Sequence, residues 1–422
     1  MTPEIKQRIE QIRRGEVPER YVKTALGLAP ANWKRYTFGD IYTERKEPGD
    51  ENLPLLMVSI HSGVSDGEVD AAELPKQVKR IEDKSQYKKA VSGDLVFNMM
   101  RAWQGAIGTV RATGMVSPAY IVAEPNDKVY PLFMDYYSRT PQMINQIDRQ
   151  SYGVTDFRKR LYWDSFAPIG CILPPIEEQQ KIATILTTQD KVIELKEKRL
   201  AEKQRQKKYL MQQLLTGKKR LPGFSGTWKN IKLCEVLSER KEKNIEQNLR
   251  ICSVAVQKGV IDQIEHLGRS YAASDTSNYS VAHYGDIIYT KSPTGDFLYG
   301  IVKQNLLQET VAVSPLYGVF TPMTFGLGYF LHTYFQSAIY AQNYLLPIVQ
   351  KGAKNTINIT NDTFISSKLY LPLDVEEQKA IADTFIAADR EIELLQQDIE
   401  QEKQKKKALM QLLLTGIVRV KT

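Results

Sequence analysis

The sequence contains little of what a disulfide framework or a metal centre needs. Its 422 residues include only three cysteines and four histidines. Cys171, Cys234 and Cys252 lie far apart in apolar contexts, so they predict reduced thiols of the hydrophobic core and no disulfide. No histidine lies at metal-ligand spacing from a cysteine or from another histidine, and each of the four is expected to be a surface or strand residue. A zinc site is therefore not predicted.

Long hydrophobic runs are also absent. No run of about 18 apolar residues is present, which excludes an ordinary transmembrane helix. The segment Met1–Lys6 is polar and lacks the apolar core of a signal peptide. With reduced cysteines, this predicts a cytoplasmic protein. The net charge of +8 and the pI near 9.0 permit nucleic-acid binding without establishing it.

Catalytic motifs are missing as well. Gly285–Ser292 resembles a phosphate-binding loop but lacks the glycine before Lys291. Glu194-Leu195-Lys196 could suggest a nuclease centre, but it falls inside a predicted helix. There is no glycine-rich cofactor fingerprint and no Asn/Asp-Pro-Pro-aromatic methyltransferase motif. The chain is predicted to be a binding protein with no catalytic, cofactor or metal site of its own.

A long repeated segment is the strongest feature that the sequence does contain. Glu177–Gly217 begins Glu-Glu-Gln and ends Leu-Leu-Thr-Gly, and Glu376–Gly416 repeats both ends 199 positions later without a gap. Apolar residues recur in each copy at spacings of four and seven, which predict a coiled-coil helix interrupted by a lysine, Lys207 or Lys406. The stripe residues are Ile182, Leu186, Ile193, Leu200, Leu210 and Leu214, and Ile381, Phe385, Ile392, Ile399, Leu409 and Leu413.

The charges of the two copies indicate how these helices pair. The first copy is basic, most densely from Lys203 to Lys208, whereas the second is acidic from Asp389 to Glu402. An antiparallel arrangement places the acidic stretch against the basic one and opposes the two helix dipoles. We therefore predict an antiparallel coiled coil, although any single lysine could simply belong to a solvated face.

The segments that precede the two helices are also related. Trp33 and Trp228 open matching apolar patterns, and Gly93–Phe97 matches Gly285–Tyr289. The matches are short, β-branched or aromatic, and bounded by Gly, Asp or Pro, which is typical of strands. The fold class is predicted to be α+β, with two duplicated globular domains that are each followed by a long helix. The predicted parts are an N-terminal helical arm (1–30), a first domain (31–172), helix 1 (173–220), a second domain (221–370) and helix 2 (371–422).

Loops rich in groups suited to DNA occur at matching places in both domains. Arg, Lys, Gln and Asn can read base edges, and Lys and Thr can position phosphates. Any of them could instead be an ordinary polar turn residue. The candidate DNA-binding residues are Arg101, Trp103, Gln104, Tyr152, Arg158, Lys159 and Arg160 in the first domain, and Lys291, Thr294, Lys351, Lys354 and Asn355 in the second.

With these features the sequence resembles the specificity (S) subunits of type I restriction–modification enzymes. The resemblance is carried by Leu173–Gln179 and Leu371–Gln378, by the Leu-Leu-Thr-Gly that ends each helix, and by the half-chain repeat. It implies two target recognition domains that each read one half of a bipartite duplex DNA site. The helices would set the separation of these domains and dock modification and restriction subunits. S-adenosylmethionine would belong to the modification subunit, and ATP and Mg²⁺ to the restriction subunit.

Two other functions are compatible with the residues alone. The chain could be a coiled-coil scaffold whose duplicated domains bind protein and have no DNA specificity. It could also be a methyltransferase whose active site carries no familiar motif. Co-purification with a methyltransferase, together with failure to retard any duplex, would favour the first alternative, and methyl transfer by the isolated chain would favour the second.

Overall fold

The chain folds into two units, each built around one end of both long helices. The computed structural model describes residues 3–60, 63–65, 86–155, 158–351 and 357–420. Unit 1 comprises Met1–Lys196 with Asp398–Thr422, and unit 2 comprises Glu197–Gln397. Among the helices of these described residues, none is both long enough and apolar enough to cross a membrane.

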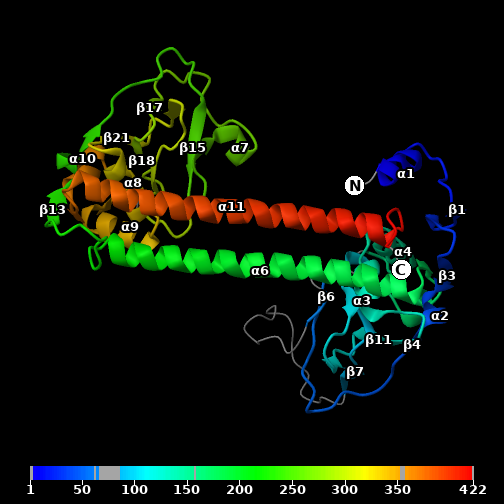
Figure 1. The fold of residues 1–422 in the computed structure, drawn as a ribbon. Coiled ribbons are helices and arrows are strands. Elements are labelled where there is room, and N and C mark those ends of the chain that lie inside the picture. Colours follow the sequence, from blue (N-terminus) through cyan, green and yellow to red (C-terminus); the bar gives the residue numbers. More distant parts are fainter. Residues whose placement is uncertain (1–2, 61–62, 66–85, 156–157, 352–356, 421–422) are drawn as a thin grey trace. The chain divides into compact units, whose positions relative to one another are not determined.

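Unit 1 combines short antiparallel strands with helices (Figure 1). Its main sheet has the strand order β4-β11-β8-β9, and β3 pairs separately with β12. The elements are α1 (Pro3–Arg13), β1 (Tyr21–Thr24), β2 (Gly27–Pro30), β3 (Lys34–Thr37), α2 (Phe38–Ile41), β4 (Tyr42–Glu44), β5 (Val58–Ser59), β6 (Gly63–Val64), β7 (Lys88–Ala90), β8 (Leu95–Asn98), the 3-10 helix η2 (Ala102–Gln104), β9 (Ile107–Thr109), β10 (Gly114–Val116), β11 (Tyr120–Pro125), α3 (Pro131–Tyr137), α4 (Pro141–Gln150), α5 (Trp163–Phe166), β12 (Gly170–Leu173) and the first part of α6 (Ile176–Leu214).

Unit 2 repeats this plan. Its main sheet has the order β14-β21-β18-β19, and β13 pairs with β24. The elements are β13 (Lys229–Lys232), the 3-10 helix η4 (Leu233–Glu235), β14 (Leu237–Glu239), β15 (Ile251–Ala255), β16 (Gly259–Asp262), α7 (Gln263–Leu267), β17 (Ser280–Ala282), β18 (Ile287–Tyr289), β19 (Val302–Gln304), β20 (Val311–Val313), β21 (Gly318–Pro322), α8 (Phe325–Tyr334), α9 (Ala338–Leu345), the 3-10 helix η5 (Leu346–Ile348), β22 (Gln350–Lys351), β23 (Ile357–Asn358), α10 (Asn361–Ser366), β24 (Lys368–Leu371) and α11 (Val375–Leu414).

The two units share a framework and differ in a second layer. In unit 2, strands β16-β15-β20-β17 form a four-stranded sheet in which β15 and β20 are parallel. In unit 1 the matching residues form the short pairs β5-β6 and β10-β7, joined by a parallel bridge between Leu55 and Met115. The predicted α+β class and the predicted duplication are both confirmed.

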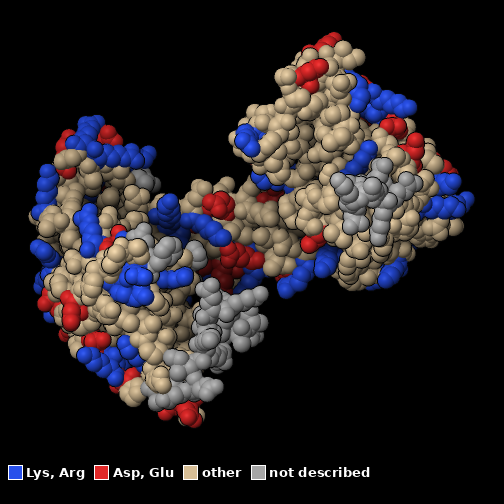
Figure 2. Space-filling model, turned by 180° about the vertical axis from the view of Figure 1, so that it is seen from behind, with Lys and Arg blue, Asp and Glu red and all other residues tan. Residues whose placement is uncertain are grey.

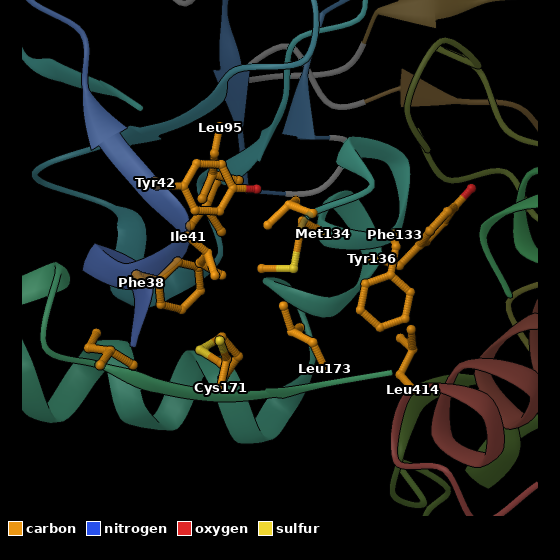
Figure 3. Packing of buried hydrophobic residues seen from close by; sticks show 14 of the residues in the cluster. Phe38, Ile41, Tyr42, Leu95, Phe133, Met134, Tyr136, Cys171, Leu173 and Leu414 are labelled. Atoms are coloured by element: carbon orange, nitrogen blue, oxygen red, sulfur yellow. The ribbon is translucent and has the colours of Figure 1, made fainter. Parts of the chain in front are cut away.

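The core of each unit includes residues from both long helices. In unit 1 the Phe166 ring packs between Phe38 and Phe97, with its centroid 4.3 Å from that of Phe38 and 4.5 Å from that of Phe97. Figure 3 shows Leu414, from the end of α11, in the same cluster as Phe133 and Tyr136 of α3. In unit 2 the equivalent cluster combines Leu214 of α6 with sheet, α8 and α11 residues. Neither core is complete without its share of both helices.

The two long helices run antiparallel within each unit. In unit 1, Lys196 Nζ of α6 lies 2.8 Å from Asp398 Oδ1 and 2.9 Å from Glu402 Oε1 of α11. Hydrogen bonds from Lys196 and Gln189 lower the pKa of Glu402 to about 2. In unit 2, Lys203 Nζ lies 2.9 Å from Glu391 Oε2. The predicted antiparallel pairing and its charge complementarity are therefore confirmed.

The lysines that interrupt the apolar stripes make equivalent contacts. In unit 1, Asp190 of α6 pairs with Lys406 at 2.5 Å and accepts a hydrogen bond from Tyr136 Oη at 2.6 Å. In unit 2, Asp389 of α11 pairs with Lys207 and accepts a hydrogen bond from Tyr329 Oη at 2.9 Å. Each interruption is thus a polar link between the helix pair and its globular domain.

A buried carboxylate at the start of each helix joins three parts of the chain. In the Glu178 cluster, Glu178 accepts hydrogen bonds from Trp33 Nε1 at 3.2 Å and from Arg419 Nε and Nη2 at 2.6 and 2.7 Å. In the Glu377 cluster, Glu377 accepts them from Trp228 Nε1 at 3.1 Å and from Arg220. Both carboxylates lie in the first turn of a helix, where the helix dipole favours negative charge.

Two expectations about rare residues need correction. Cys171 and Cys252 are buried, but Cys234 is exposed, so the prediction of three core thiols is wrong for Cys234. Cys234 lies on the outer side of the short η4 turn, where only Leu233 of that turn is buried. His332 is not a surface or strand residue but lies buried in α8.

Candidate nucleic-acid interface

The structure brings two of the predicted DNA-binding loops of unit 1 together. The first, the β8–β9 loop, covers residues 99–106, and the second, the α4–α5 segment, covers residues 151–162, of which 156–157 lie outside the described residues. The backbone N–H of Leu161 donates to the carbonyl oxygen of Met99 at 2.9 Å. Lys159 Nζ lies 5.0 Å from the centroid of the Trp103 ring. The two loops therefore form one surface.

The β8–β9 loop is held by its own hydrogen bonds. The Asn98 side chain accepts from the backbone N–H of Met100 at 2.9 Å, and Trp103 Nε1 donates to the Met100 carbonyl at 3.1 Å. Ala102 is fully buried and anchors η2. The predicted residues Arg101 and Gln104 flank this anchor and are exposed. Their side chains are available to an external ligand on a fixed backbone.

The α4–α5 segment is a narrow loop closed by a bridge. The backbone groups of Tyr152 and Arg160 exchange hydrogen bonds of 3.1 and 2.9 Å, and Lys159 Nζ pairs with Asp148 at 2.8 Å. At Gly153 a Cβ atom would lie 2.4 Å from the carbonyl oxygen of Arg158, so the close approach requires glycine. Arg158 is exposed at the end of the loop.

Three apolar side chains beside these basic groups, Tyr162, Val154 and Met100, were not predicted from the sequence, whereas Trp103 and Tyr152 were. The Tyr162 ring lies next to the Tyr152 ring in a tilted arrangement, with centroids 5.7 Å apart, and the two residues are 43 and 58% exposed. Val154 is 90% exposed and Met100 is 40% exposed. Tyr162 stands two residues after Arg160 in an extended segment, so period-two alternation could have placed it on the same face.

The β18–β19 loop of unit 2 occupies the position of the β8–β9 loop. Its predicted residues are Lys291 and Thr294. Thr294 and Phe297 exchange two backbone hydrogen bonds of 3.0 Å, and the buried Phe297 ring anchors the turn. Thr294 is exposed, whereas Lys291 is partly buried, and that burial lowers its pKa. Lys291 also has a φ of +59°, a conformation that L residues rarely adopt.

The last predicted loop lies partly outside the described residues. Lys351 is in β22, which pairs with β23 in antiparallel fashion, with Lys351 opposite Ile357. Lys354 and Asn355 lie outside the described residues. This hairpin precedes α10 just as the α4–α5 segment precedes α5.

The side chains of these loops are of the kinds that bind a ligand and do not catalyse a reaction. Guanidinium, ammonium, amide and aromatic groups can contact phosphates and base edges. Figure 2 shows Lys and Arg side chains spread over the visible face of both units, with Asp and Glu side chains among them. Within the described residues, no group of three or more His, Cys, Asp or Glu side chains could hold a metal ion.

Comparison with known proteins identifies related chains. The family model described as "type I restriction modification DNA specificity domain" matches residues 73–204 and 226–404, which is more than half of the chain. The MjaVIII type I restriction enzyme specificity subunit of Methanocaldococcus jannaschii is 23% identical over 80% of this chain and 83% of its own length. The putative MjaX specificity subunit of the same organism is 23% identical over 96% of this chain and 98% of its own length.

A solved structure shares the fold. The S subunit of a type I restriction-modification system from M. genitalium has a TM-score of 0.53 with this chain and is 10% identical in sequence. The match covers 93% of this chain and 97% of that one. At this identity the likeness concerns the fold alone.

Proposed function

This chain belongs to the type I restriction modification DNA specificity family, and we propose that its two units each read one half of a bipartite DNA target. The chain is a specificity subunit, which recognises DNA and performs no catalysis itself. It acts with other subunits of a restriction–modification system. Its recognition domains are residues 31–172 and 221–370, its spacer helices are 173–220 and 371–422, and residues 1–30 form an N-terminal arm.

One observation supports the two-part target above all others. The units share their sheet order and their helix contacts, yet the loops at the equivalent β8–β9 and β18–β19 positions differ in sequence and conformation. A repeated framework with different loops suits two reading surfaces that face different base sequences. In this proposal the contacting residues are the exposed side chains of the loops described above.

The remaining chemistry belongs to partner subunits. The modification subunit binds S-adenosylmethionine and transfers the methyl group, and the restriction subunit uses ATP and Mg²⁺. The complex acts on double-stranded DNA in the cytoplasm. The helix pair fixes the separation of the recognition domains and supplies a docking surface for the modification subunit.

Selection from a random duplex library tests the proposal directly. The full chain, assembled with its modification subunit, should enrich two short conserved motifs separated by an interval of constant length. Replacing residues 31–172 by the matching domain of another family member should change one motif and leave the other. A single continuous motif, or no enrichment, would contradict the two-part reading and favour a protein-binding scaffold.

Shortening the helices tests their role in spacing. Residues 197–200 and 393–396 lie near the contact between Lys203 and Glu391 and can be deleted together. Four residues correspond to about 6 Å of helix at 1.5 Å per residue. At about 3.4 Å per base pair, we expect the interval between the motifs to shrink by roughly two base pairs. An unchanged interval would show that the helices do not set it.

A further inference from the structure

A groove in unit 2 contains a buried lysine whose charge is not balanced. The groove has a volume of about 1060 Å³ and lies where α6, α11, α8 and β19 meet. Lys303 of β19 lines it and is only 4% exposed. Among the residues that the structure describes, none forms a hydrogen bond or an ion pair with Lys303 Nζ. Burial lowers the pKa of Lys303 to about 8.

The groups around Lys303 supply more donors than acceptors. Asp389 is already bound by Lys207 and by Tyr329 Oη. Lys207 also donates to Gln336 Oε1 at 2.8 Å. Asp389 therefore acts on Lys303 only through space, and its carboxylate already accepts from two other donors.

A second place where hydrogen-bond donors outnumber acceptors involves His332. Its Nδ1 accepts the backbone N–H of Gln304 at 2.9 Å, so the proton of the neutral ring is on Nε2. Burial, followed by the charge of Lys303, lowers the pKa of His332 and keeps this ring neutral. Nε2 lies 2.9 Å from Gln336 Nε2, another donor. If the Gln336 amide were turned, its oxygen would accept from His332 Nε2, but its NH2 group would then face Lys207 Nζ, which is also a donor. One additional acceptor is therefore needed in either orientation.

Unit 1 shows how the chain balances a buried charge at the same place. There Gly108 occupies the strand position of Lys303, opposite Val96 as Lys303 is opposite Ile288. The buried charge at this place in unit 1 is Asp135, which accepts from the backbone N–H of Thr109 and pairs with two arginines. That charge is compensated within the unit.

Unit 2 cannot supply such a carboxylate from the same helix position. Tyr136 and Tyr329 are equivalent, because they donate to aspartates 199 positions apart, and so Asp135 corresponds to Gly328. A Cβ atom at Gly328 would lie 2.3 Å from Gln304 Nε2. The acceptor for Lys303 must therefore come from elsewhere.

The rim of the groove indicates the kind of molecule that brings it. Tyr284, Leu306 and Ile339 line the groove and are 46, 39 and 68% exposed. Aromatic residues are enriched at protein interfaces, and exposed apolar side chains next to a buried ammonium suit a protein segment better than DNA, whose phosphates are contacted by Arg, Lys and other polar groups. Gln304 Oε1 also lacks a donor among the described residues. A polypeptide can supply both an acceptor and an N–H donor.

We propose that this groove receives an acidic side chain carried on an apolar segment of a partner protein, whose carboxylate reaches Lys303 Nζ. The proposal rests on the proposed function only for the identity of that partner, the modification subunit. It does not depend on which loops contact DNA.

Titration of the full chain with the purified modification subunit, without DNA, tests the contact. Lys303→Met should weaken binding by at least about tenfold, because it leaves a buried carboxylate without its partner. Lys208→Met is the matched control, since Lys208 lines the same groove but is exposed, and it should change binding by less than about twofold. Unchanged binding of Lys303→Met would overturn the proposal. Wild-type chain that binds no modification subunit would instead count against the proposed function.

Photo-crosslinking identifies the bound segment. A benzophenone residue in place of Ile339 should crosslink to a peptide of the modification subunit that contains Asp or Glu among apolar residues. Lys303→Glu should abolish the complex, and exchanging that acidic residue for lysine should restore it. A crosslink to duplex DNA would overturn the proposal. Protection of the groove by inorganic phosphate alone, as complete as protection by the modification subunit, would do the same.

Discussion

The Glu178 cluster offers a test of how the end of the chain stabilises unit 1. Arg419→Met removes two charge-assisted hydrogen bonds from a carboxylate that is 0% exposed, which leaves Trp33 Nε1 as its one donor among the described residues. Removing one partner of a buried ion pair costs about 3–5 kcal/mol. Because the Arg419 side chain is 32% exposed, water can reach the vacated site, and we expect a loss of about 3 kcal/mol.

Differential scanning calorimetry measures this loss. A unit of 150–250 residues loses about 2–4 °C of Tm per kcal/mol, so the transition of unit 1 should fall by roughly 6–12 °C. Hydrogen exchange should show lost protection around Trp33 and Glu178. Arg220→Met is the matched variant in the Glu377 cluster, and it should produce the same loss around Trp228 in unit 2.

A double variant separates the ion pair from general packing. Adding Glu178→Gln to Arg419→Met removes the stranded charge and keeps an acceptor for Trp33 Nε1. The double variant should therefore be more stable than Arg419→Met alone. A fall of less than about 2 °C for Arg419→Met, or a double variant that is no more stable, would refute this account of the cluster.

Three further predictions concern other parts of the chain. Gly328→Ala should destabilise the protein by about 1–3 kcal/mol, because its Cβ would meet Gln304. Gly226→Ala, with nothing within 4 Å, is the control, and equal losses in urea unfolding would contradict the reasoning. Between pH 8 and 10.5, Lys303 is more protonated in the unfolded chain than in the folded chain, because its pKa is about 8 in the fold and 10.5 outside it. The contribution of Lys303 to the free energy of unfolding should therefore rise with pH across this range, by up to roughly 3 kcal/mol. Lys303→Met should remove that rise. Arg158→Ala should weaken DNA binding and lower the slope of log affinity against log salt by about one.

Much of the fold could be predicted because the sequence pattern of a domain followed by a long helix occurs twice in the chain. The helix pairing follows from a 3.5-residue periodicity and from opposite charges, both of which are local patterns. The short strands follow from matching segments such as Gly93–Phe97 and Gly285–Tyr289, whereas the order of the strands in each sheet was not predicted. The compact units, however, divide α6 and α11 near their middles. That division depends on which globular domain packs on each half of a helix, and no local pattern records it.

Apart from the pairing of the two long helices, the contacts that join distant residues could not be predicted. Arg419 reaches Glu178 across 241 positions, and nothing beside either residue marks the partner. Lys303 appears in the sequence as an ordinary strand lysine, and its burial arises from helices far along the chain. The candidate DNA-binding residues remain predictions, although the structure places those of the β8–β9 loop and the α4–α5 segment on one surface.

The shared helices have a consequence for how the protein is made. Unit 2 is a continuous stretch of chain, whereas the core of unit 1 includes Leu413 and Leu414, and the Glu178 cluster includes Arg419. During synthesis the first domain to leave the ribosome is therefore the last that can finish folding. A premature stop after residue 397 would leave unit 2 whole and expose the apolar interior of unit 1. The exposed apolar surface that chaperones and proteases recognise would then lie in the N-terminal domain, although the mutation lies near the C-terminus.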